Sequence, residues 1–230
     1  MGVKVAIRAD ASTQIGIGHV MRCLTLAEEL KSGGHECLFI CREQAGSGIE
    51  LIREQDHKVE LLPPIDRKLK LETDDKTLSN REALLEATQA EDARLCVDII
   101  SAFNPHWLIV DQYSLGARWE GIVRKYVENL MVIDDLADRR HDCDILLDQN
   151  YTNRLVSNYT ALVSPDASIL LGPQYALVRR EFAELRWQSL KRRKQVKKEN
   201  VLVFMGGSDP DNDTGKVIRG FLKSTIIENL

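Results

Sequence analysis

The sequence lacks several features that mark common classes of protein. No stretch approaches the roughly 18 apolar residues of a membrane span, and no charged and then apolar leader precedes the first apolar run. The net charge of −4 leaves no broadly basic surface, and we interpret the one dense basic run, within 191–198, as the solvated face of a linker. We therefore expect no membrane association, no nucleic-acid partner and a cytoplasmic location.

Cysteine is sparse and scattered. The five cysteines form an odd set with no C-x-x-C pair and no histidine at the spacing of a zinc site. They are expected to be buried, reduced thiols, and the sequence predicts neither a structural metal nor a cofactor. A catalytic pair made of His141 and Cys143 stays open as an alternative.

What the chain does contain is an alternation of branched apolar runs with helical periods. This pattern predicts an α/β fold, a parallel sheet covered by helices. Strands are expected at 3–8, 36–41, 58–61, 107–111, 130–134, 145–147 and 169–171. Helices are expected at 20–32, closed by Gly33-Gly34, and at 48–55, 81–103 and 117–126, with an exposed connection at 63–79.

The chain divides into three predicted parts. Residues 1–173 form the first domain, and residues 174–199 form a charged bridge that is helical over 174–198. Residues 200–230 repeat the pattern of the N-terminus, with a strand at 201–205, a glycine turn and a helix from about Thr214. We expect this last part to be the opening β-loop-α unit of a second, incomplete nucleotide-binding domain.

The glycine-rich loop after the first strand is the most informative segment. Gly16 and Gly18 permit close approach of a ligand to the backbone, and the following helix N-terminus favours an anion such as a phosphate. His19 then supplies a group that can move a proton near neutral pH. The purely structural alternative is a tight turn followed by an ordinary helical histidine, since Met21 breaks the full G-x-G-x-x-G pattern. Four ionisable residues around one crevice favour the functional interpretation: Arg8, Asp10, His19 and Arg22.

Carboxylates follow several of the predicted strands. Asp111, the pair Asp134-Asp135 and Asp148 all stand at carboxyl ends, which meet at the ligand-binding edge of a parallel sheet. Taken singly, Asp148 and one of the pair are interpreted as turn or cap residues. A divalent metal is an alternative that we do not favour, because adjacent carboxylates on extended backbone point in different directions.

Six ordered motifs together carry a resemblance to a known family. They are R-x-D at 8–10 with I-G-x-G-H-x-x-R at 15–22; D-Q-Y at 111–113; D-D at 134–135; H-x-C-D-I-L-L at 141–147; Y-A-L-x-R-x-E-F at 175–182; and M-G-G-S-D at 205–209. In these motifs the chain resembles the nucleotide-sugar hydrolases of pseudaminic acid biosynthesis. That family is similar in turn to the glycosyltransferase B architecture, in which two Rossmann-like domains face a cleft.

The resemblance implies hydrolysis of a UDP-sugar at its anomeric carbon with inversion, without a metal or cofactor. It implies that His19 is the catalytic base and that Tyr113 lines the sugar pocket. Asp10 could orient His19, while Arg8 and Arg22 either hold an anion or pair with Asp10. Backbone N–H groups of the second glycine turn would face the diphosphate. The implied substrate-binding set is Arg8, Asp10, Gly16, Gly18, Arg22, Asp111, Tyr113, Asp135, Gly206, Gly207, Ser208 and Asp209.

Two features depart from the family pattern. Gln112 and Ser114 stand where the pattern has histidine and glycine, which predicts one altered polar contact in the sugar pocket. The sequence also ends at Leu230, before the rest of the second domain, so we expect weak binding and slow turnover from these residues alone. The alternatives are a glycosyltransferase that uses a UDP-sugar donor and a binding module without catalysis.

Overall fold

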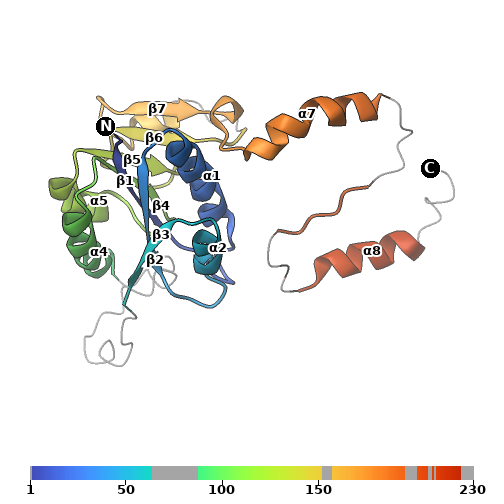
Figure 1. Cartoon of the computed structure of the whole chain (residues 1–230), viewed down its shortest axis with the longest axis horizontal. Helices are drawn as coiled ribbons and strands as arrows, with labels where there is room; N and C mark the ends of the chain where they lie inside the picture. The colour runs from blue at the N-terminus through green and yellow to red at the C-terminus, as the bar shows by residue number, and fades with distance from the viewer. Residues whose placement is uncertain are drawn as a thin grey trace.

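The computed structural model describes residues 2–63, 88–151, 157–194, 201–206, 209 and 211–223. Seven parallel strands form one sheet in the order β3-β2-β1-β4-β5-β6-β7 (Figure 1). The strands are β1 (Lys4–Ala9), β2 (Glu36–Arg42), β3 (Lys58–Leu62), β4 (Trp107–Asp111), β5 (Asn129–Ile133), β6 (Ile145–Asp148) and β7 (Ser168–Leu171). This is the Rossmann strand order with one more strand at the edge, so the predicted doubly wound α/β sheet is confirmed.

Helices cover both faces of the sheet. Helices α1 (Gly18–Ser32) and α2 (Ile49–Glu54) pack over β1 and β2, where Leu24 and Ile52 share a core with Ile7. Helices α4 (Gln89–Phe103) and α5 (Ala117–Val123) cover the other face, where Trp119 joins a second core. Alternate side chains of each strand point to opposite faces, so one strand contributes to both cores. The five cysteines are buried and free, as predicted.

Local signals in the sequence fix the ends of two of these helices. Helix α1 ends in a Schellman motif: Gly34 has φ +82°, and the N–H of His35 donates to the carbonyl of Leu30. Helix α4 begins after a capping box between Thr88 and Glu91. The predicted helix 81–103 therefore begins later than expected in the described chain, and 81–87 and most of the 63–79 connection lie outside the described residues.

The segment after β7 differs from its prediction. A 3₁₀ turn, Pro173–Tyr175, and an extended stretch precede helix α7, which spans Arg180–Arg193 instead of beginning at residue 174. Proline at the start of the turn and the extended backbone at Ala176 delay the helix. Residues 195–198 of the predicted helix lie outside the described residues.

The predicted strand at 201–205 is wrong. Its β-branched and aromatic residues favour extended backbone, but a strand also needs a hydrogen-bonding neighbour, and in the described chain this segment joins no sheet. Leu202 is 91% exposed and Phe204 is 76% exposed. The helix predicted from Thr214 is present as α8 (Asp213–Lys223). The division into 1–173, 174–199 and 200–230 stays a prediction.

In the ranges given above, no helix combines the length and apolar character needed to cross a membrane.

The strand order reverses between β1 and β4, which pair in parallel with Ala9 opposite Asp111. In open α/β sheets, ligands bind at this switch point, outside the carboxyl ends of the strands. The fold therefore places the loop after β1 and the residues after β4 at one crevice.

Candidate active site

The loop between β1 and α1 is held by its own backbone. The hydroxyl of Ser12 accepts hydrogen bonds from the N–H groups of Gln14 and Ile15, and its carbonyl accepts one from Gly16 at 2.7 Å. Gly16 has φ +81°, a conformation that favours glycine. Thr13 donates to the carbonyl of Ala45, which ties the loop to the segment after β2. The loop thus fixes where α1 begins and where its first turn points.

His19 on that first turn forms a hydrogen bond with Asp111 at the end of β4. Nδ1 of His19 lies 2.5 Å from Oδ1 of Asp111, and both side chains are buried. Burial alone would raise the pKa of Asp111, but hydrogen bonds from Arg22 and the interactions with His19 hold it below its ordinary value of 3.8. Because an ionised carboxylate only accepts hydrogen bonds, the contact with Asp111 places a proton on Nδ1, and Nε2 is the ring atom left to act as a base. Nη2 of Arg22 also lies 3.3 Å from Nδ1.

Arg22 lies one turn further along α1 and joins the ends of two strands. Its Nε and Nη2 atoms donate to both oxygens of Asp111, at 2.5 and 2.6 Å, and Nη1 donates to Asp135 at 3.1 Å. Burial opposes the charge, yet these two carboxylates raise the pKa of Arg22 further above its ordinary range. Arg22 is therefore a permanently charged clamp that orients the partner of His19.

Tyr113 lies beside the imidazole of His19. The two rings meet edge to face, with centroids 4.4 Å apart and an angle of 82° between planes. Partial burial, and then a hydrogen bond to Asp135, raise the pKa of Tyr113 to about 12. Its hydroxyl is therefore neutral at ordinary pH, with its proton directed to Asp135.

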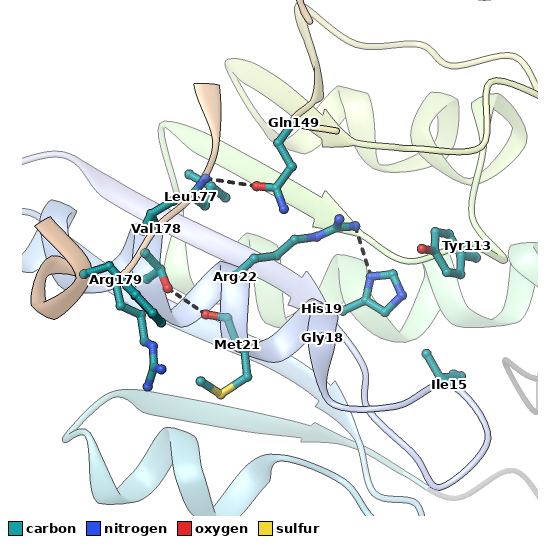
Figure 2. A pocket seen from close by; sticks show the side chains of 12 residues that line it. Ile15, Gly18, His19, Met21, Arg22, Tyr113, Gln149, Leu177, Val178 and Arg179 are labelled. Atoms are coloured by element: carbon teal, nitrogen blue, oxygen red, sulfur yellow. Dashed lines mark hydrogen bonds between the residues drawn. The ribbon is translucent and has the colours of Figure 1, made fainter. Parts of the chain in front are cut away.

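These side chains open into a cavity of about 530 Å³. Figure 2 shows the second ring nitrogen of His19 on the side away from Arg22, between Tyr113 and Ile15. The far wall is formed by the segment that leads into α7, and it is mostly apolar. The complete lining is Ile15, Gly18, His19, Met21, Arg22, Thr25, Tyr113, Gln149, Leu177, Val178, Arg179 and Phe182. A volume of this size suits a small-molecule ligand.

Gln149 and the wall from Leu177 to Phe182 were missed as site residues by sequence reasoning. Gln149 follows β6, so the rule that drew attention to Asp111 could also have found it. Its Oε1 accepts a hydrogen bond from the N–H of Leu177 at 3.0 Å. The approach of the 177–182 segment to α1 depends on tertiary contacts, which no local pattern encodes.

Arg8 and Asp10 lie beneath the loop and do not line the cavity. Arg8 makes two hydrogen bonds to Asp10, at 2.5 and 2.7 Å, and also pairs with Asp92 of α4 at 2.9 Å. The pairing alternative for Arg8 is therefore the one observed. Asp10 does not orient His19; Asp111 does, because the buried pair with Arg8 turns Asp10 away. Arg22 pairs with Asp111 and Asp135 instead of Asp10.

Gln112 belongs to the same buried network. Its Nε2 donates to Asp10 at 3.0 Å, and its Oε1 accepts from the N–H of Ser114. The predicted change of a polar contact in the sugar pocket is therefore not seen: the side chain after Asp111 points into the protein, because alternate residues at the end of β4 face opposite sides.

The remaining carboxylates at strand ends have two different roles, as expected. Asp134 accepts from the N–H groups of Leu136 and Ala137, and Asp148 accepts from that of Asn150, so both form turns. Asp135 instead faces Arg22 in the site. Within the described ranges, no group of three or more His, Cys, Asp or Glu side chains is arranged to hold a metal ion.

The alternative Cys–His pair gains no support from its surroundings. The ring of His141 bonds to Glu120, with Nδ1 2.7 Å from Oε1. Burial, reinforced by the charge of Glu120, raises the pKa of the Cys143 thiol to about 12. A nucleophilic cysteine needs the opposite shift.

The candidates in the second glycine turn are separate from this cavity. Gly207 and Ser208 lie outside the described residues. Gly206 has φ +86°, and Asp209 accepts hydrogen bonds from the N–H groups of Asp213 and Thr214 at the start of α8. Neither Gly206 nor Asp209 lines the cavity around His19, and their roles stay predictions.

No family model matches the sequence. Two solved structures resemble the fold: TcCGT1 in complex with UDP (TM-score 0.43, 19% identity, 58% of this chain and 28% of that one) and a glycosyltransferase from Rickettsia africae (TM-score 0.45, 11% identity, 86% and 51%). An uncharacterized protein of Methanocaldococcus jannaschii is 26% identical over 222 residues, 96% of this chain and 40% of that protein.

A second curated relative carries a named activity. The UDP-2,4-diacetamido-2,4,6-trideoxy-β-L-altropyranose hydrolase of Campylobacter jejuni is 28% identical over 225 residues. The match covers 98% of this chain and 68% of that protein, so this chain spans part of the length of both relatives. The resemblance predicted from the six motifs is thereby confirmed: the chain is similar, over nearly all of its residues, to a UDP-sugar hydrolase.

Proposed function

We propose that this chain acts on a nucleotide sugar and hydrolyses UDP-2,4-diacetamido-2,4,6-trideoxy-β-L-altropyranose to the free sugar and UDP, as a step in pseudaminic acid biosynthesis. The observation that carries the proposal is the Asp111–His19 pair, which leaves the lone pair of Nε2 at the cavity. The named activity of the Campylobacter relative supplies the substrate. The similarity to that relative over 98% of this chain supports assigning the same substrate to this chain.

In the proposed reaction, a water molecule in the cavity attacks C1 of the sugar from the face opposite the UDP group. Nε2 of His19 takes a proton from this water as the new C1–O bond forms. The bond between C1 and the diphosphate oxygen breaks, and its electron pair leaves with UDP. The configuration at C1 inverts, and His19 later returns the proton to solvent.

The proposed reaction needs few catalytic groups besides His19. UDP is a good leaving group because its diphosphate stabilises the departing charge, so strong acid assistance is not required. Asp111 stabilises the imidazolium that forms when His19 gains a proton, and Arg22 keeps that carboxylate in place. Tyr113 and the apolar wall offer the sugar a ring face and aliphatic surface.

The test is release of UDP in the absence of any sugar acceptor. The proposal predicts that the diacetamido sugar nucleotide yields UDP and free sugar, and that in H₂¹⁸O the label enters the sugar at C1 and not UDP. NMR of the first product anomer should show inversion. Release that requires a hydroxyl acceptor would identify a glycosyltransferase instead, and binding without release would identify a binding module.

A further inference from the structure

Gln149 is a cavity residue whose amide has a fixed orientation. It follows the last residue of β6, and its Oε1 accepts the N–H of Leu177 at 3.0 Å. Only an oxygen can accept from a backbone N–H, so this contact decides which branch of the amide is nitrogen. Figure 2 shows the nitrogen turned away from Leu177, on the side of Arg22.

The Nε2 group of Gln149 is a donor available to a ligand. In the part of the chain that the structure describes, it has no hydrogen-bond partner. The neighbouring polar groups are already engaged: Arg22 donates to two carboxylates, and the hydroxyl proton of Tyr113 is directed to Asp135. A neutral donor that borders a ligand cavity recognises an acceptor oxygen.

The surface next to this donor is aliphatic. Leu177, whose N–H fixes the amide, lines the cavity together with Val178. An acetamido group carries a carbonyl oxygen that accepts a hydrogen bond and, one bond beyond the carbonyl carbon, a methyl group that favours apolar contact. The adjacent donor and aliphatic wall complement these two features.

We propose that Gln149 is a specificity-determining residue that donates from Nε2 to the carbonyl oxygen of one acetamido group of the sugar, whose methyl group packs on Leu177. This inference rests on the proposed function, which supplies an acetamido-bearing substrate. It adds a recognition role for a residue outside the His19–Asp111–Arg22 cluster.

The test uses Gln149→Glu, which keeps an oxygen for the N–H of Leu177 but replaces the donor with a second oxygen. KM and kcat are measured with the diacetamido sugar nucleotide and with its two counterparts in which one acetamido group is a hydroxyl; Ki or calorimetric Kd replaces KM for any compound that is not turned over. Gln188→Glu is the matched control, because Gln188 is exposed on α7 and does not line the cavity.

Gln149→Glu is expected to weaken binding of the diacetamido compound about 10-fold or more, since a carboxylate cannot donate to a carbonyl. The counterpart that carries a hydroxyl in place of the acetamido group recognised by Gln149 should lose much less affinity, because a hydroxyl can donate to the new carboxylate. Gln188→Glu should leave both constants unchanged. An equal loss for all three compounds would overturn the inference.

A second variant separates recognition from support of the wall. Gln149→Leu removes the acceptor for Leu177 as well as the donor. If Gln149→Glu binds all compounds like the wild type and only Gln149→Leu fails, Gln149 merely supports the 177–182 segment and the inference is wrong. The wild-type rate tests the proposed function separately, since it can be zero while the binding pattern of Gln149→Glu still holds.

Discussion

Nδ1 of His19 lies 2.5 Å from Oδ1 of Asp111, although the two residues are 92 positions apart in the sequence. The parallel pairing of β1 with β4 explains the contact. It sets Ala9 opposite Asp111, and the loop after β1 returns the first turn of α1 over the end of β4. A histidine oriented by a carboxylate is a general arrangement for moving a proton.

Replacing Asp111 with asparagine should lower kcat about 100-fold or more, the range attributed to a positioned base. The amide carries no charge to stabilise the imidazolium, and its NH₂ group replaces one of the two oxygens that accept from His19 and Arg22, so the network that fixes the ring is broken. Steady-state kinetics at constant pH measures the effect. Asp144→Asn is the matched control. Asp144 pairs with Arg124 at 2.5 Å and is partly exposed. It directly precedes β6 and therefore lies at the amino ends of the strands, away from the site. Normal kcat in a folded Asp111→Asn protein would contradict the role given to Asp111.

The activity should fall on the acid side as the imidazole of His19 takes up a proton. Because interactions with Arg22 and His19 hold the pKa of Asp111 below 3.8, that carboxylate stays ionised over the same range. Where one proton inactivates the base, kcat/KM falls about tenfold per pH unit. The measurement is a pH–rate profile with circular dichroism at each pH. A flat acid limb in folded protein would point to another base.

The buried ion-pair network around Asp92, beneath the loop after β1, should contribute strongly to the free energy of unfolding. Asp92 pairs with Arg8 and Arg42, at 2.9 and 2.8 Å, and accepts from the indole of Trp119 at 2.9 Å. Replacing Asp92 with asparagine leaves two buried guanidinium groups without their shared counter-charge and should cost about 3–5 kcal/mol at neutral pH. Urea denaturation of the two proteins gives this difference.

The pH dependence of that difference follows from the pKa of Asp92. Burial would raise the pKa, but the two arginines lower it to about 2 from an ordinary 3.8. The stabilising contribution of the charged carboxylate is therefore complete above 3.8 and is lost as the pH falls through about 2. The difference in unfolding free energy between wild type and Asp92→Asn should narrow by about 2 kcal/mol in this window, and a constant gap down to pH 2 would contradict the assignment.

Removal of divalent metals should leave the reaction unaffected. The proposed mechanism assigns proton transfer to His19 and relies on the diphosphate as a good leaving group, with no step that a metal performs. Hydrolysis with excess EDTA is expected to proceed at the untreated rate. A loss of activity that added Mg²⁺ restores would show that the mechanism omits a required ion.

Much of the fold could be predicted because its signals are local. Most strands of the sheet contain a short run of branched apolar residues, and Gly34 ends α1 where its positive φ is needed. The convergence of His19, Asp111 and Asp135 followed from one topological rule about strand ends, whereas Tyr113 was implied by the family resemblance. These residues could therefore be named before their distances were known.

The features that sequence reasoning missed depend on distant partners. Arg8 pairs with Asp92, 84 positions away, so the role of Arg8 and Asp10 beneath the loop could not be separated from anion binding. The wall at Leu177 is set by Gln149 from another strand end. The 201–205 segment has the composition of a strand, but composition cannot supply the neighbouring strand that it needs.

The most direct test of the central claim is the single-turnover rate of UDP release by His19→Asn, measured with the Kd for the diacetamido sugar nucleotide. Asparagine can donate to Asp111 in place of Nδ1–H but offers no base to water. We predict a rate at least about 100-fold below wild type with Kd nearly unchanged. Wild-type turnover by His19→Asn, or a loss explained entirely by weaker binding, would contradict the account.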